Sequence, residues 1–106
     1  MKLTKIERRR WRTLIANLRR LSTSPTVVKT IRLDYDGLIA RHKTHYLIKV
    51  SSMLSFQQRC ETLAHEWAHV LDNFERHCGD EDKQHSETWG VYYSACYRLA
   101  LKEILA

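Results

Sequence analysis

Long apolar runs are missing from this 106-residue chain. No stretch approaches the ~18 consecutive apolar residues that a membrane-spanning helix requires, so we expect no membrane partner. The basic start, from Met1 to Ser24, also lacks the apolar stretch of about 7–15 residues that a secretory signal needs. Its arginine-rich, acid-poor composition could imitate a mitochondrial presequence, but the same residues fit a structural helix. We therefore expect a cytoplasmic protein.

Paired cysteines are also missing. The three cysteines, Cys60, Cys78 and Cys96, are odd in number and form no C-x-x-C pair. Without a secretory signal, reduced thiols in a cytosol-like compartment are the default. Cys60 and Cys96 fall on helical faces and are expected in the core, whereas Cys78 lies in a polar stretch and is the cysteine we expect to be exposed.

Acidic residues are scarce in the first 22 positions only. This segment carries eight Lys/Arg and one Glu, whereas residues 23–106 carry ten Lys/Arg and eleven Asp/Glu. The net charge of +6 therefore comes from one local segment, which suggests an anionic partner there. An amphipathic helix that packs its apolar side and leaves its arginines in water explains the same residues. Contact with nucleic acid through this helix stays an open prediction.

Apolar spacing and turn signals predict one α+β domain. Pro25 ends an N-terminal helix, and Asp36-Gly37 is a turn signal between two or three antiparallel strands of a small twisted sheet. Ser55 and Gln58 form a capping box that opens a second helix. The expected N-terminal helix, sheet, second helix and C-terminal helix occupy residues 1–22, 26–52, 55–74 and 84–105 of a single domain, 1–106.

The stretch "LAHEWAHVLD", Leu63 to Asp72, contains a His-Glu-x-x-His core. On a helix, His65 and His69 lie one turn apart on the same face, so their ring nitrogens can take two corners of a tetrahedral zinc site. Glu66 lies about 100° around the helix, where its carboxylate can reach water at the metal and accept a proton. The spacing therefore predicts two zinc ligands, His65 and His69, and a general base, Glu66.

A catalytic zinc site usually has three protein ligands and one open position, and the sequence offers several candidates for the third. The metzincin spacing fails, because Asp72 and Glu75 stand where it needs glycine and histidine. His77, Glu87 and His85 remain as candidates. The polar loop before the last helix would let that helix fold back and present His85 to the metal.

The stretch from Leu63 to Tyr93, "LAHEWAHVLDNFERHCGDEDKQHSETWGVYY", resembles the metal-binding region of SprT-like proteins. That family includes the Spartan DNA–protein-crosslink proteases, and its pattern is H-E-x-x-H, a loop, and then H-G-x-x-F/W at the start of a helix. Here the second half reads "HSETWG", in which His85 matches the third ligand and Trp89 the aromatic residue. The resemblance covers Tyr46 to Arg98 and implies a zincin-like fold, a Zn²⁺ cofactor and peptide-bond hydrolysis.

The chain departs from the family pattern at two points. Ser86 replaces the usual glycine, and Cys96 is the only cysteine after the motif. The match is therefore to a minimal zincin core, of the kind found in small phage or bacterial reading frames, and any DNA-binding role of the family's four-cysteine zinc ribbon does not carry over. The resemblance also implies that an edge strand near Tyr46 to Ser52 borders the cleft and holds an extended peptide through its backbone.

Further side chains could serve the site. Asp72 could accept a hydrogen bond from a ligand imidazole, or it could be a surface residue near the helix end. His42 and His45 could approach the cleft, although isolated strand histidines more often face solvent. The helper that stabilises the developing oxyanion stays open among four residues, namely Tyr46, His77, Tyr92 and Tyr93.

Two hypotheses follow from these residues. The first is a zinc metallopeptidase that acts on a protein or peptide substrate, with Glu66 as general base and His65, His69 and His85 as ligands. The second is a catalytically silent, zinc-stabilised module that binds nucleic acid or a partner protein through the basic N-terminal helix. The sequence leaves the physiological substrate and the oligomeric state open.

Overall fold

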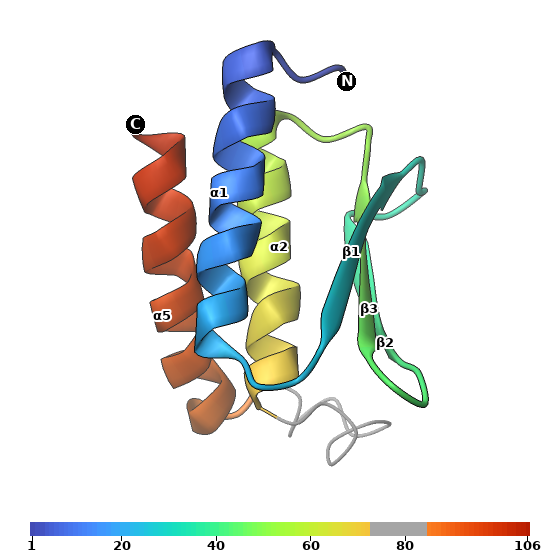
Figure 1. Ribbon diagram of the computed structural model, residues 1–106, viewed down its shortest axis with the longest axis vertical. Coiled ribbons are helices and arrows are strands. Elements are labelled where there is room, and N and C mark those ends of the chain that lie inside the picture. The colour runs from blue at the N-terminus through green and yellow to red at the C-terminus, as the bar shows by residue number, and fades with distance from the viewer. Residues whose placement is uncertain (73–84) are drawn as a thin grey trace.

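The computed structural model describes residues 1–72 and 85–106, which form three helices and a three-stranded sheet (Figure 1). In chain order the elements are α1 Lys5–Leu21, β1 Thr26–Ile31, β2 Gly37–Arg41, β3 Tyr46–Ser51, α2 Phe56–Leu71 and α5 Glu87–Ile104. The α+β class and the order of elements expected from the sequence are confirmed. The expected polar loop, with His77 and Cys78, lies outside the described residues.

Side-chain caps set the starts of α1 and α2. Thr4 Oγ1 accepts the N–H of Glu7 at 3.1 Å, and the Glu7 carboxylate accepts the N–H of Thr4 at 2.9 Å. Ser55 and Gln58 make the same reciprocal pair before α2, as expected. Such pairs satisfy N–H groups that the helix itself leaves unbonded. The cap at Thr4 is the reason that α1 begins at Lys5, later than the predicted helix.

The sheet is mixed, with strand order β1-β3-β2. β3 pairs antiparallel with β2, so that Arg41 lies opposite Tyr46, and parallel with β1, so that Thr26 lies opposite Tyr46. The prediction of antiparallel strands is correct for β2 and β3 and wrong for β1 and β3. β2 and its connections serve as the crossover that a parallel pair needs, and side-chain alternation alone does not reveal the direction of the partner strand.

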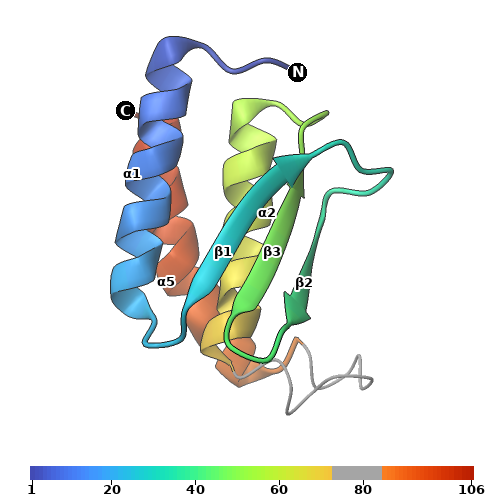
Figure 2. The same ribbon diagram turned by 45° about the vertical axis from the view of Figure 1, so that its right-hand side comes forward.

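β3 is the central strand, which corrects the expectation that residues 46–52 form an edge beside the cleft. Its alternate side chains Tyr46, Ile48 and Val50 are buried, because this face of the sheet packs against α2 (Figure 2). Within the described residues, β2 is an edge strand, paired on one side only.

α2 is the centre of the molecule and packs against α1, α5 and the sheet (Figures 1 and 2). Its Leu63 and Trp67 are fully buried, as are Cys60 and Cys96, which confirms the two cysteines as core residues. α5 runs antiparallel to α2 (Figure 1). The second half of α2 therefore lies beside the first turn of α5.

α1 buries Leu14 and Leu18 against this core and leaves most of its cations in water. The exposed basic residues of the helix are Lys5, Arg8, Arg9, Arg12, Arg19 and Arg20. Among the helices of residues 1–72 and 85–106, none combines the length and the apolar content that crossing a bilayer requires.

Candidate metal centre

Three histidine side chains meet where α2 and α5 come together. His65 and His69 belong to α2, and His85 directly precedes the cap of α5. Each offers one ring nitrogen, and these atoms all lie within 4.8 Å of one another. The structure thus brings together the three histidines that the sequence and the family resemblance indicate. Glu87, the alternative third ligand, is exposed in the first turn of α5 and is not part of this group, and the alternative His77 lies outside the described residues.

The chemistry of the three donors suits a metal ion, and one pair of ring nitrogens has the spacing of ligands in a tetrahedral site. Nε2 of His85 lies 3.4 Å from Nε2 of His65. Two imidazole nitrogens bound to zinc at about 2.0–2.1 Å and a tetrahedral angle would lie about 3.3–3.4 Å apart. A hydrogen bond between neutral imidazoles would explain the short distance between His65 and His85. It would not explain why a ring nitrogen of His69 also lies close to both. Imidazole ligands suit zinc, copper, iron and nickel, so the three histidines are close enough to bind a transition-metal ion.

Burial favours the protonation state that binds a metal. It lowers the pKa of His65, and the neighbouring His85 lowers it further. A lower pKa favours the neutral imidazole, whose free lone pair is the ligand. His69 is 6% exposed and lies deeper in the helix interface than His85, which is exposed.

Trp89 forms an aromatic wall against all three histidines. Its ring centroid lies 5.0 Å from that of His65, 5.4 Å from that of His69 and 4.7 Å from that of His85. Its other neighbour is Tyr93, which stacks on it at 4.9 Å with an interplanar angle of 11°. Trp89 is the residue that matches the aromatic position of the SprT-like pattern, and its contacts restrict the orientations of the imidazole rings.

Ser86 accounts for the local path of the chain at His85. It is the N-cap of α5, and its Oγ accepts the N–H of Trp89 at 3.4 Å. Its φ of −69° is open to any residue, so the backbone here does not need the glycine that the family carries. A serine at this position adds a cap and leaves His85 free to turn toward α2.

Glu66 lies beside the histidines but is not one of the cluster. Its side chain is 9% exposed and has no hydrogen-bond or ion-pair partner among residues 1–72 and 85–106. Burial raises the pKa of Glu66 to about 7. A carboxylate with such a pKa can accept and release a proton near neutral pH.

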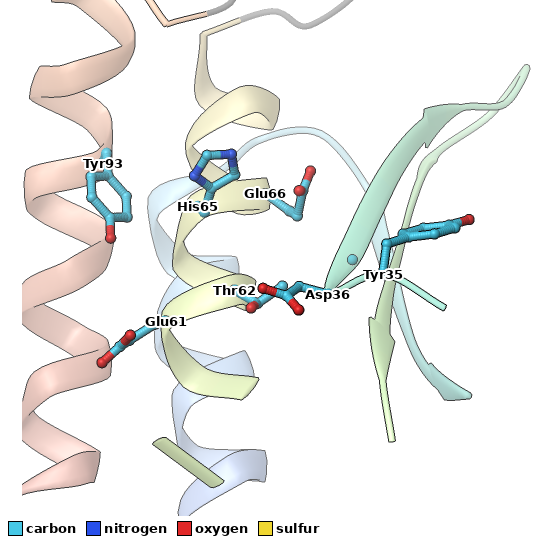
Figure 3. Close-up of a pocket in the computed structure, with 8 residues that line it drawn as sticks. Tyr35, Asp36, Glu61, Thr62, His65, Glu66 and Tyr93 are labelled. Carbon is cyan, nitrogen blue, oxygen red and sulfur yellow. The ribbon is translucent and has the colours of Figure 1, made fainter. Parts of the chain in front are cut away.

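An open cleft of about 540 Å³ adjoins His65 and Glu66. Figure 3 shows the Glu66 carboxylate directed from α2 toward the strands, with Tyr93 of α5 on the other side of His65. The remaining walls come from two places. Tyr35 and Asp36 of the connection before β2, with Gly37 at the start of the strand, form one wall, and Glu61 and Thr62 of α2 form the other.

Gly37 lets β2 approach α2 closely enough to form this cleft. A Cβ at this position would lie 2.7 Å from Cγ2 of Thr62 and 2.9 Å from the carbonyl oxygen of Lys49. Both distances are shorter than side chains tolerate, so only glycine fits without a shift of the strand. The sequence marked Gly37 as part of a turn, whereas the structure places it as the first residue of β2.

The other residues considered for the site are dispersed. Among the described candidates for an oxyanion helper, Tyr93 lines the cleft, while Tyr46 is 3% exposed in the core and Tyr92 is not part of the cleft wall. His42 and His45 stack on each other in the connection between β2 and β3, outside the three-histidine group.

Asp72 is the C-cap of α2 and is 6% exposed. This burial rules out the surface position considered for it. A hydrogen bond from the N–H of a candidate ligand imidazole to the Asp72 carboxylate stays a prediction.

Sequence reasoning missed two acidic members of the cleft wall, Asp36 and Glu61. Glu61 lies one helical turn before His65, and Thr62 lies one turn before Glu66. Helical spacing could therefore have identified Glu61, together with Thr62, as a neighbour of the site. Asp36 comes from a distant segment, and only the packing of β2 on α2 brings it there.

Comparison of the chain with family models, with curated proteins and with solved structures gave no match.

Proposed function

We propose that the chain is a zinc-dependent peptidase in which His65, His69 and His85 hold the metal and Glu66 is the general base. The observation that carries this proposal is the convergence of three imidazole nitrogens within 4.8 Å of one another. Next to them, at an open cleft, lies the buried Glu66, which has no partner in the described part of the chain. The SprT-like resemblance of the H-E-x-x-H and HSETWG motifs supports it, because it assigns the same histidines.

The ligand set leaves room for chemistry at the metal. Three histidines fill three of the four positions of a tetrahedral zinc site. When bound, zinc would supply Lewis acidity, which lowers the pKa of a water molecule to about 7 and polarises a carbonyl group. The imidazoles of His65 and His69 project from α2 and contact Trp89, so the packing of the chain itself restrains these two rings.

Glu66 is the residue that we assign to proton transfer. Its carboxylate takes a proton from the water whose oxygen attacks the peptide carbonyl carbon, and it returns the proton to the nitrogen that leaves when the C–N bond breaks. The proton count is balanced across the two steps. Its position one residue after His65, at the cleft, suits both transfers.

Tyr93 is the residue that we assign to the oxyanion. It lines the same cleft as Glu66, and its ring is held by the stack on Trp89. Burial raises the pKa of Tyr93, and the nearby Glu61 and Tyr97 raise it further. The phenol therefore keeps its proton and can donate a hydrogen bond to an oxygen that gains negative charge.

The edge of β2 is the place that we assign to an extended peptide. Within the described residues this strand pairs only with β3, so the backbone groups on its other side can pair with a bound chain. β2 thus takes the role that the family resemblance gave to residues 46–52. Its first residue, Gly37, lies against the cleft.

The test compares the wild-type chain with Glu66→Gln, using a casein substrate and zinc-loaded protein. We expect both to bind about one zinc ion, and we expect Glu66→Gln to lose about 10²–10⁴-fold in kcat because the general base is gone. A chelator should stop the wild-type reaction, and added zinc should restore it. Equal turnover by the two proteins, or turnover that survives chelation, would end the proposal.

The second candidate function, a silent zinc-stabilised module, has one observation in its favour. Lys5, Arg9 and Arg12 are exposed on α1 and have no carboxylate partner among the described residues, and such cations can contact phosphates. Zinc binding without any turnover, together with salt-sensitive retention of DNA, would favour the module over the peptidase.

A further inference from the structure

The cleft beside the three histidines has an acidic wall, although the chain as a whole carries a net charge of +6. Asp36 contributes a carboxylate from the start of β2, and Glu61 contributes one from α2 (Figure 3). Among residues 1–72 and 85–106, no lysine or arginine is part of the wall. The local charge of the cleft is therefore opposite in sign to that of the molecule.

Neither carboxylate is neutralised by the part of the chain that the structure describes. Glu61 accepts one hydrogen bond, from Nε2 of Gln57 at 3.0 Å. Asp36 uses its backbone oxygen to accept the N–H of Ser51 at 2.8 Å, and its exposed side chain has no ion-pair partner there. Both groups are free to receive a cation from outside.

Glu66 gives an independent reason to expect an occupant. This side chain is nine-tenths buried, lines the same cleft and lacks a partner within residues 1–72 and 85–106. A carboxylate on a side chain so shielded from water is poorly solvated, and a polar group of a bound molecule would give it a hydrogen-bond partner. The volume of about 540 Å³ falls in the range of small-ligand pockets.

Two tyrosines make the cleft suitable for a long cationic side chain. Tyr93 lines it from α5, on the side of His65, and Tyr35 lines its outer edge just before β2, with its ring directed away from α2 (Figure 3). Aromatic faces attract ammonium and guanidinium groups, and they also cover the apolar stem of a lysine or arginine. Carboxylates with aromatic neighbours thus match both parts of such a side chain.

We propose that this cleft selects peptides that carry a lysine or arginine beside the bond to be cleaved, through the carboxylates of Asp36 and Glu61. The cleavage part of the statement rests on the proposed peptidase function. Recognition is a binding property, however, and it can be measured without turnover. A free peptide N-terminus is another source of an ammonium group, so the test separates the two sources.

The binding experiment uses the full chain with Glu66→Gln, loaded with zinc, so that no peptide is consumed. The probes are acetylated and amidated Ala-Ala-Xaa-Ala-Ala peptides in which Xaa is lysine, arginine, norleucine or glutamate. Norleucine keeps the aliphatic stem without the charge. We expect lysine and arginine peptides to bind about tenfold more tightly than the norleucine peptide, as two partly exposed ion pairs allow, with NMR shifts at the amides of Gly37 and Thr62.

Four variants in the same background locate the effect. Asp36→Asn and Glu61→Gln should each reduce the lysine preference about threefold, and together they should abolish it. Asp34→Asn is the matched control, because it removes one exposed carboxylate from the same loop without touching the cleft wall. It should leave the preference intact.

The outcomes separate this inference from the peptidase proposal. Equal affinity for lysine and norleucine peptides, no binding of either, or a preference that survives the double variant overturns the inference. If an alanine peptide with a free N-terminus binds as tightly as the blocked lysine peptide, the cleft recognises the N-terminal ammonium group, and this result also overturns the inference. If lysine peptides bind selectively but the wild-type chain cleaves no peptide, the recognition inference stands and the peptidase proposal ends. If the wild-type chain cleaves peptides with and without lysine equally well, the peptidase proposal stands and the recognition inference ends.

Discussion

Nε2 of His85 lies 3.4 Å from Nε2 of His65, although twenty positions separate the two residues in the chain. Such an approach of two ring nitrogens is what a shared metal ion would require, and it depends on the antiparallel packing of α5 on α2. His85 is therefore the candidate ligand whose role depends most on the tertiary fold.

We predict that His85→Ala weakens zinc affinity by more than about 100-fold, since it removes a ligand rather than a supporting contact. The measurement is a competition titration against a chromogenic chelator. His42→Ala is the control, because His42 lies outside the three-histidine group, and it should not change the affinity. An unchanged zinc affinity in His85→Ala would show that the third ligand is a different residue.

We predict that Tyr93→Phe lowers kcat on a peptide substrate by about 10²-fold with little change in KM, as expected for the loss of one hydrogen-bond donor to the oxyanion. The ring and its stack on Trp89 remain in this variant, so folding should not suffer. The control is Tyr92→Phe, which removes the neighbouring hydroxyl away from the cleft. If both variants lose activity equally, Tyr93 has no special part in the reaction.

We predict that Gly37→Ala lowers the free energy of unfolding by about 1–3 kcal/mol, because the added methyl group overpacks the contact with Thr62 and the backbone at Lys49. Urea titration measures this change. Gly90→Ala is a matched control: a Cβ there meets no atom within 4 Å, and alanine is favoured over glycine inside a helix by about 0.5–1 kcal/mol. A Gly37→Ala chain as stable as the wild type would mean that β2 shifts without cost.

We predict that the protein loses stability as the pH rises above about 9. Burial raises the pKa of Cys96 to about 12, and burial with nearby Glu103 raises the pKa of Cys60 to about 12. These folded-state values exceed those of thiols in the unfolded chain, so the unfolded state loses protons first and is favoured as the pH rises from about 9 toward 12. Below pH 8 the two thiols should add no pH dependence.

The measurement is the free energy of unfolding by urea at pH 8 and pH 10. The Cys60→Ala/Cys96→Ala double variant serves as the reference, because it keeps the other groups that titrate in this range. The wild type should lose more stability between the two pH values than the reference does. Parallel pH profiles would show that the buried thiols contribute nothing.

The helical part of the site was predictable because spacing along a helix fixes which side chains share a face. His65 and His69, one turn apart, needed no knowledge of the fold. His85 was only one of three candidates, because its position depends on how α5 packs on α2. Its choice from the sequence came from the family pattern and not from spacing.

The sheet was less predictable, because its order depends on pairing between distant segments. Alternation identified Tyr46, Ile48 and Val50 as one face of a strand, and that face is buried. It could not show that this strand lies in the middle of the sheet, or that β1 runs parallel to it. The acidic wall at Asp36 was missed for the same reason, since it exists only after β2 packs on α2.

The contact of Trp89 with all three imidazoles has a practical consequence. An indole fluoresces, and its emission responds to the charge and polarity of the groups that touch it. Loading the site with an ion would place a positive charge beside this ring, while the other two tryptophans, Trp11 and Trp67, are not part of the histidine cluster. The fluorescence of Trp89 would therefore report whether an ion occupies the three-histidine group.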